Sequence, residues 1–82
     1  MQKFYYVYIL TSENDPSRYY SGFTEDLDKR LKAHNAGQVQ HTKRYKPWYF
    51  ETVVAFRSRE KAITFEKYLK SHSGRSFSSR HF

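Results

Sequence analysis

The stretch FYYVYILT, Phe4 to Thr11, is the most informative segment for the architecture of this chain. It is a run of aromatic and β-branched residues, apolar on both alternating faces, which is the pattern of a strand covered on each side. The turn formers of Ser12 to Ser17 follow it, and then comes the aromatic segment RYYSGF, residues 18–23. The two segments therefore predict a hairpin with Phe4–Thr11 as the central strand of a sheet.

Farther along the chain, Thr24 is expected to cap a helix over residues 25–35, with Glu25 and Asp26 in its first turn. Gly37 lies where the C-terminal cap of that helix is expected. These residue types stand at the positions that helix ends favour. The spacing therefore predicts a first helix directly after the hairpin.

The polar, basic segment from Gly37 to Pro47 has no periodicity and predicts a loop. WYFETVVAF, Trp48 to Phe56, predicts a third strand, and Ser58 is expected to cap a second helix over 59–71. The order β-β-α-β-α predicts an α+β fold: a small, mainly antiparallel three-stranded sheet packed by helices.

Composition limits the class of protein. The 82 residues predict a single domain, 1–82, because a chain of this length holds one small core. Lys and Arg number 15 against 8 Asp and Glu, and this net charge of +7 favours a polyanionic partner such as nucleic acid. The absence of Cys excludes disulfides and thiolate metal sites. With no membrane span and no signal peptide in view, we expect a cytoplasmic protein that does not contact membranes.

Both predicted helices carry ionisable residues on their apolar faces. In LDKRLKAH, Leu27 to His34, the residues Arg30 and His34 share a stripe with leucines at helical spacing. On the second helix, Glu66 projects within the apolar arc of its neighbours. Either Arg30 and Glu66 form a structural buried ion pair, or both line a polar cleft that opens on the sheet. Since a buried pair stabilises little, the cleft is favoured.

Tyrosine hydroxyls of the hairpin are the next candidates for that cleft. Tyr8 and Tyr20 belong to the two paired strands, so their hydroxyls face one site if the pleat orients them alike. Spacing alone does not select them over Tyr6 or Tyr19, because most of the eight tyrosines must be packing residues.

Together these residues resemble the GIY-YIG nuclease superfamily, in particular the small bacterial proteins made of that domain alone. The resemblance extends from Phe4 to about Ser71. Two departures exist: Tyr6 stands where the first motif has Gly, and the SHSGRSF region offers no counterpart of the Asn that many members place after the metal-binding Glu. The segments that carry the resemblance are Tyr6-Val7-Tyr8, Tyr20-Ser21-Gly22, D-L-x-x-R-L-x-x-H with Arg30 and His34, and F-E-K-x-L-K with Glu66.

The resemblance implies a metal-dependent endonuclease in which water attacks a phosphodiester. Tyr8 matches the tyrosine that closes the first motif and Tyr20 the one that opens the second, and either would position or deprotonate the water. Arg30 matches the catalytic arginine, whose planar donors suit phosphoryl oxygens. His34 matches a histidine that hydrogen-bonds the phosphate or supports the tyrosine, and a satisfied core histidine is the alternative. Glu66 matches the single carboxylate that holds Mg²⁺ or Mn²⁺.

A basic surface is predicted from the loop and the C-terminal tail. The candidates to follow a nucleic-acid backbone are Lys43, Arg44 and Lys46 in the loop with Arg75 and Arg80 in the tail. Tyr45 or Trp48 is a candidate to stack on a base, and His41 belongs to the same loop. The alternative is a solvated basic loop without a ligand.

Three functions of different classes remain open from the sequence. The first is a Mg²⁺-dependent endonuclease that acts on DNA and selects nucleic-acid shape, because a small domain has few side chains to reach base edges. The second is a nucleic-acid-binding module of the same fold with little or no catalysis. The third is a basic protein-interaction domain. We prefer the first, because every catalytic residue type is in place.

Overall fold

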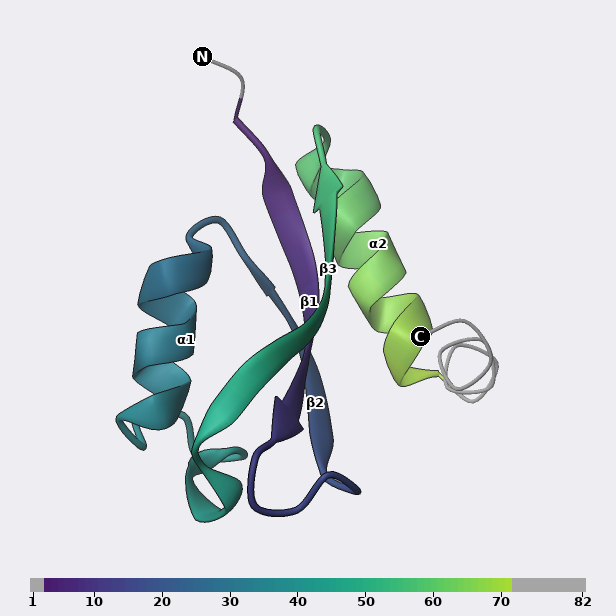
Figure 1. The fold of residues 1–82 in the computed structure, drawn as a ribbon. Helices are drawn as coiled ribbons and strands as arrows, with labels where there is room; N and C mark the ends of the chain where they lie inside the picture. The colour runs from purple at the N-terminus through teal and green to yellow at the C-terminus, as the bar shows by residue number, and fades with distance from the viewer. Residues whose placement is uncertain (1–2, 72–82) are drawn as a thin grey trace.

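Strand β1, Tyr5–Ser12, lies at the centre of a three-stranded antiparallel sheet in the order β2-β1-β3. The computed structural model describes residues 3–71 (Figure 1). Its other elements are β2 (Tyr19–Thr24), α1 (Leu27–Asn35), a short 3₁₀ helix η1 (Lys43–Tyr45), β3 (Trp48–Phe56) and α2 (Arg59–Lys70). The predicted order β-β-α-β-α and the α+β class are confirmed.

The two helices cover opposite faces of the sheet, as Figure 1 shows with α1 and α2 on either side of the strands. On one face, Val7 and Ile9 of β1 pack with Ala62 and Leu69 of α2. On the other face, residues of the opposite parity pack with α1 and the start of β3; they include Tyr8, Leu10, Leu27, Leu31 and Trp48. This double cover explains why the sequence of β1 is apolar on both faces.

A β-bulge divides β3. Ile9 pairs with Thr52, whereas the next residue, Leu10, pairs with Phe50, so Glu51 is an extra residue on β3. Because one extra residue inverts the alternation of side chains, Phe50 faces the α1 side while Thr52 faces the α2 side. The bulge thus supplies apolar side chains from one strand to both halves of the core.

The end of α1 agrees with the predicted cap, but its start does not. Asp26, and not Thr24, caps the helix: an Oδ1 atom of Asp26 accepts from the backbone N–H of Lys29 at 3.0 Å. Thr24 is still the last residue of β2, and its hydroxyl accepts from the Asp26 N–H at 3.1 Å. The helix therefore begins at Leu27, after the residues predicted for its first turn. At the other end, Gly37 has the positive φ of 76° that a C-terminal glycine supplies.

The connection between α1 and β3 is more ordered than the predicted loop. Besides η1, it contains Thr42, which is fully buried. The Asn35 side chain fixes the start of β3, because its amide accepts from the Trp48 N–H at 2.6 Å and donates to the Trp48 carbonyl at 3.1 Å. On α2, the prediction for Ser58 is confirmed, since its hydroxyl accepts from the Lys61 N–H at 3.2 Å.

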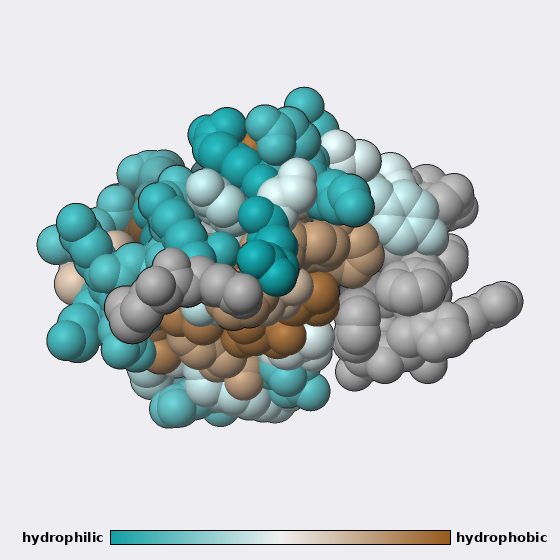
Figure 2. All heavy atoms as spheres, turned by 90° about the horizontal axis from the view of Figure 1, so that it is seen from above, coloured by the Kyte–Doolittle hydropathy of each residue, from teal (hydrophilic) through white to brown (hydrophobic). Residues whose placement is uncertain are grey.

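Apolar residues are visible at the end of the sheet shown in Figure 2. Figure 2, seen from the end where β1 begins and β3 ends, shows apolar residues in the middle of this face, with hydrophilic ones on both sides. Val53, on the β3 edge strand, is 38% exposed. Within residues 3–71, neither helix has the length and apolar character needed to cross a membrane.

Candidate functional site

Tyr8 and Tyr20 lie on the same face of the sheet, the one covered by α1. Tyr8 pairs with Gly22 and Leu10 pairs with Tyr20 across β1 and β2, which places all four residues on one face. The glycine is required for this arrangement, because a methyl group at Gly22 would overlap the Tyr8 hydroxyl. The condition that the pleat should orient both tyrosines alike is therefore met.

The alternatives Tyr6 and Tyr19 are placed elsewhere. Tyr19 points to the other face of β2 and is 61% exposed. Tyr6 shares the face of Tyr8, but it pairs with Thr24 at the far end of the hairpin and contacts the ring of Phe4. The fold thus brings Tyr8 and Tyr20 together and separates Tyr6 and Tyr19 from them, a distinction that the spacing in the sequence did not provide.

Two residues of α1 meet the Tyr8 hydroxyl. His34 Nε2 lies 2.9 Å from Tyr8 Oη, and Arg30 donates from Nε to the same oxygen at 3.2 Å. Leu27 and Leu31 anchor α1 against the sheet one turn away on the same stripe. The histidine and the arginine face inward because Tyr8 gives both of them a polar partner inside the core.

Burial sets the protonation of this group. Tyr8 and His34 are both 0% exposed. Burial raises the pKa of the Tyr8 phenol above its usual value, although the Arg30 guanidinium opposes this. Burial, with the Arg30 charge as a second cause, lowers the pKa of His34 to about 4. Near neutral pH the pair is therefore a neutral phenol and a neutral imidazole.

Arg30 has its remaining donors available. Within residues 3–71, its one side-chain hydrogen bond is the Nε contact with Tyr8, and it forms no ion pair with Glu66. The two terminal nitrogens of the guanidinium have no hydrogen-bond partner among residues 3–71, so their donors remain for a ligand. Arg30 is half-buried, so these donors lie at the border of the site. Of the two alternatives from the sequence, the direct ion pair is wrong.

Glu66 instead forms an ion pair with Lys70, one turn later on α2. Glu66 Oε2 lies 2.7 Å from Lys70 Nζ, and the Glu66 side chain is only 17% exposed. The Lys70 ammonium also lies 5.2 Å from the centre of the Tyr20 ring. The predicted inward projection of Glu66 agrees with its burial, and the lysine connects the carboxylate to the tyrosine.

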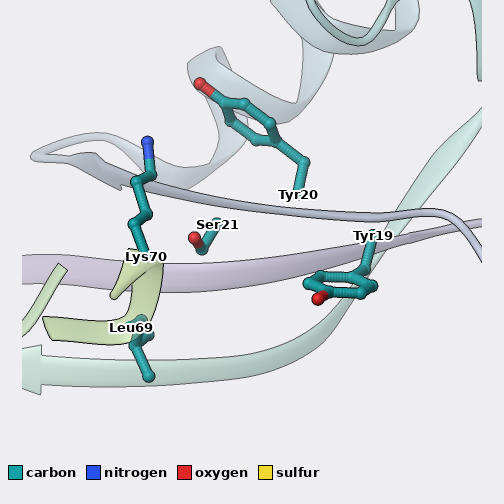
Figure 3. Close-up of a pocket in the computed structure, with 5 residues that line it drawn as sticks. All are labelled: Tyr19, Tyr20, Ser21, Leu69 and Lys70. Atoms are coloured by element: carbon teal, nitrogen blue, oxygen red, sulfur yellow. The ribbon is translucent and has the colours of Figure 1, made fainter. Parts of the chain in front are cut away.

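An open hollow borders these groups between α2 and the outer edge of β2. It is lined by Tyr19, Tyr20, Ser21, Leu69 and Lys70. Figure 3 shows the Tyr20 ring and the Lys70 side chain directed to the same side, with Leu69 directed to the other. Tyr20 is half-buried, whereas Tyr8 is sealed. Of Tyr8 and Tyr20, it is therefore Tyr20 that a molecule in the hollow can reach.

Glu66 alone could bind Mg²⁺ only if water and substrate phosphate oxygens supplied the remaining ligands. Within the described part of the chain, no cluster of three or more His, Asp and Glu residues could hold a metal ion by itself. Mg²⁺ commonly binds one or two carboxylates and completes its shell with water and phosphate oxygens. The single carboxylate of Glu66 fits Mg²⁺ or Mn²⁺ in that way, provided that Lys70 releases it.

The basic loop is only partly as predicted. Lys43, Arg44 and Lys46 are exposed, so they are accessible to a ligand. Trp48 is not available to stack on a base: it is 3% exposed, and its indole N–H donates to the Thr42 carbonyl at 2.8 Å. The indole packs inward because β3 begins on the α1 side of the core.

Other candidates of this surface have different surroundings. The Tyr45 ring lies against two guanidinium groups, those of Arg18 at 4.6 Å and Arg44 at 5.6 Å from its centre. His41 is exposed. Arg75, Arg80 and most of the SHSGRSF region lie outside the described residues.

Sequence reasoning missed Thr42. Its hydroxyl lies 2.7 Å from His34 Nδ1, on the opposite side of the ring from Tyr8. No periodicity marks this residue, since it lies in an irregular segment and is buried by the tertiary fold. The only signal in the sequence was a threonine between the basic residues of a loop.

Comparison with known proteins agrees with this geometry. A family model described as the GIY-YIG catalytic domain matches residues 4–79. The chain is 35% identical over 72 residues to the UPF0213 protein BH0048 of Halalkalibacterium halodurans, across 87% of this chain and 74% of that protein. The solution NMR structure of the UPF0213 protein BH0048 from Bacillus halodurans matches with a TM-score of 0.55 and 32% identity, across 93% of this chain and 80% of that one.

A second kind of relative is longer. The chain is 44% identical over 70 residues to the structure-specific endonuclease subunit SLX1 of Scheffersomyces stipitis, which covers 77% of this chain. The match spans only 21% of the length of that relative. The family model covers nearly the whole chain, and it includes every element that forms the site. The chain therefore belongs to the GIY-YIG nuclease family.

Proposed function

We propose that this protein is a metal-dependent endonuclease that hydrolyses phosphodiester bonds in DNA and selects the structure of its substrate more than the sequence. One observation carries the proposal: the Arg30 guanidinium is held through Nε by a buried tyrosine, and its terminal donors have no partner among residues 3–71. A planar pair of donors suits phosphoryl oxygens. The name of the longer relative, a structure-specific endonuclease subunit, supports selection by the structure of the substrate.

The roles of the side chains follow from their accessibility. The terminal nitrogens of Arg30 bind the scissile phosphate and stabilise the charge that builds on its oxygens. Tyr20, half-buried beside the hollow, positions the attacking water through its hydroxyl. Tyr8 is sealed and its pKa is raised by burial, so it stays a neutral phenol and orients Arg30. His34 supports Tyr8 from inside the core.

Glu66 is the residue that would hold Mg²⁺ or Mn²⁺. A divalent ion held by Glu66 would supply positive charge that stabilises the oxygen leaving the phosphodiester. The Lys70 ammonium, at 2.7 Å, must leave the carboxylate for this to occur. Since Lys70 is exposed on α2, its side chain can turn toward the nucleic-acid backbone instead.

Cleavage of labelled DNA of several shapes tests the proposal. Duplex, single-stranded, nicked, flap and branched DNA are incubated with the protein in Mg²⁺, Mn²⁺ or EDTA, and products are resolved on a denaturing gel. We expect metal-dependent cuts by the wild type, with one shape preferred, and none by Glu66→Gln, which keeps the shape of the side chain. Lys67→Gln, an exposed change next to Glu66, is the matched control and is expected to cut normally.

Each contrary result removes a specific part of the proposal. Cleavage that persists in EDTA would overturn the metal requirement. Equal cutting by wild type and Glu66→Gln would remove the carboxylate from the mechanism. A strong preference for one duplex sequence over scrambled duplexes at the same salt concentration would overturn selection by structure.

The Lys70–Glu66 ion pair favours a second candidate, a nucleic-acid-binding module with little or no catalysis. In that case the lysine keeps the carboxylate neutralised, and the basic surface binds DNA without cutting it. Gel shifts that fade as salt rises, with no cleavage on any substrate or metal, would select this candidate.

A further inference from the structure

Thr42 is a buried polar residue whose polar groups all have partners. It is 0% exposed, its N–H donates to the Val39 carbonyl at 3.1 Å, and its carbonyl accepts from the Trp48 indole at 2.8 Å. Its hydroxyl lies 2.7 Å from His34 Nδ1 and 3.4 Å from the Val39 carbonyl oxygen. A buried hydroxyl destabilises the fold unless it is hydrogen-bonded, and at this position the His34 imidazole is the nearest hydrogen-bond partner.

The donor and acceptor of each of these hydrogen bonds can be assigned by starting from Arg30. A guanidinium only donates, so the Tyr8 oxygen accepts from Arg30 and its own proton goes to His34 Nε2. The imidazole is then protonated at Nδ1, which donates to Thr42 Oγ1, and the threonine proton points to Val39. Every donor in this sequence has an acceptor.

The opposite tautomer breaks this order. A proton on His34 Nε2 would point at a Tyr8 oxygen that already accepts from Arg30. Within residues 3–71, Tyr8 Oη has no other hydrogen-bond partner, so the phenol proton would be buried without an acceptor. An unsatisfied buried donor is costly, and the tautomer with the proton on Nδ1 is therefore favoured.

We propose that Thr42 is a positioning residue: by accepting from Nδ1 it fixes the His34 tautomer, and through His34 and Tyr8 it orients the Arg30 guanidinium toward the phosphodiester. The second half of this statement rests on the proposed nuclease function, whereas the tautomer does not. Thr42 touches none of the groups that would contact the substrate. Its effect on cleavage passes through a continuous line of hydrogen bonds.

The groups around His34 agree with a neutral imidazole that accepts from Tyr8. Tyr8 and Tyr20 face the ring from the sheet, with ring centroids at 5.8 Å and 5.3 Å, and Arg30 is the charged neighbour on α1. No carboxylate forms an ion pair with His34 in the described part of the chain. Protonating the ring would place a second positive charge beside the guanidinium.

The test compares Thr42→Val, which keeps the shape but removes the hydroxyl, with Thr42→Ser, which keeps the hydroxyl. The imidazole ¹⁵N chemical shifts of His34, measured by NMR on the full chain without DNA, report the tautomer directly. We expect protonation at Nδ1 in the wild type and in Thr42→Ser. In Thr42→Val each tautomer leaves a buried proton without an acceptor, so the preference for Nδ1 is expected to weaken measurably. The Arg30 Nε–H signal is expected to exchange faster with solvent only in Thr42→Val.

Cleavage kinetics form the second readout. We expect kcat to fall by about 10- to 100-fold in Thr42→Val, by analogy with the loss of the hydrogen-bond partner of a metal-binding histidine, and to recover in Thr42→Ser. KM should change little, because no substrate contact is removed. Thr11→Val, at another buried threonine, is the control for the loss of a hydroxyl and should leave both readouts unchanged.

The two proposals can fail separately. Protonation at Nε2 in the wild type would overturn the role of Thr42 even if no variant folds. Equal loss of kcat in the Val and Ser variants would overturn it as well. If the wild type cuts no DNA, the proposed function fails, and the tautomer and the Arg30 signal still decide whether Thr42 orders the hydrogen bonds.

Discussion

At the scale of single residues, the site depends on a histidine that stays neutral because it is buried. His34 is 0% exposed, between Tyr8 on one side and Thr42 on the other. The neutral ring donates from Nδ1 to Thr42 and accepts from Tyr8 at Nε2, so a second ring proton would have to displace the Tyr8 proton. The imidazole therefore stabilises the folded chain only while it remains unprotonated.

Acid is expected to destabilise the protein through this residue. The pKa of His34 is about 4 in the folded chain and has an ordinary value of 6.5, so the unfolded chain binds the proton first. The stabilisation is complete above pH 6.5 and is lost as pH falls toward 4. This lowers the free energy of unfolding by about 3 kcal/mol. Urea denaturation over this pH range measures it.

The variant His34→Asn serves as the reference for that measurement. Its side chain cannot titrate, while the carboxylates that also respond to acid are unchanged. We expect the wild-type curve to be steeper than that of the variant between pH 6.5 and 4. Parallel curves for the two proteins would contradict a depressed pKa at His34.

The sequence predicted which ionisable residues face inward, because helical periodicity places them on the apolar stripe. Arg30, His34 and Glu66 are all buried or half-buried as that argument requires. The partners were not predictable in the same way. Glu66 pairs with Lys70, four residues later on the same helix, and not with Arg30, because α1 and α2 cover opposite faces of the sheet.

At the scale of elements, the bulge in β3 determines which face each residue supplies. Without an extra residue, a strand places alternate side chains on fixed faces. Glu51 interrupts this, so that Trp48 and Phe50 reach the α1 side and Phe56 reaches the α2 side. The bounds of β3 were predicted correctly from composition, but the bulge was not, because a register shift depends on pairing with β1.

Deleting Glu51 is expected to destabilise the protein far more than changing it. The deletion restores simple alternation, so one half of β3 must present its apolar side chains to solvent and its exposed ones to the core. Glu51 is exposed, so Glu51→Ala should alter the free energy of unfolding by less than about 0.5 kcal/mol. Chemical denaturation of the two variants makes the comparison, and a well-folded deletion variant with wild-type stability would show that the bulge is dispensable.

At the scale of the whole molecule, the charged loop and the start of α2 lie at opposite ends of the fold, as Figure 1 shows. The net charge of +7 predicted a polyanionic partner but could not say which surface binds it. The exposed Lys43 and Arg44 lie in η1, next to the segment that holds Thr42 against the site. This continuity between the loop and the site makes η1 the expected backbone contact.

Neutralising η1 is expected to reduce the salt dependence of DNA binding. Each phosphate contact releases condensed counterions, so log K falls as log salt concentration rises. Removing two contacts should make this negative slope shallower by about 2. We therefore compare the wild type with the double variant Lys43→Gln and Arg44→Gln, by fluorescence anisotropy on one labelled duplex over a range of salt. EDTA is included to prevent cleavage during the titration.

The control removes the same charge from the other side of the molecule. Lys61 and Lys67 are exposed on α2, and their double change to Gln lowers the net charge equally. If η1 contacts the backbone, the η1 variant loses slope while the α2 variant keeps the wild-type slope, because only local contacts release counterions. Equal slopes for the two variants would mean that the charge of the whole molecule attracts DNA and that the loop is merely solvated.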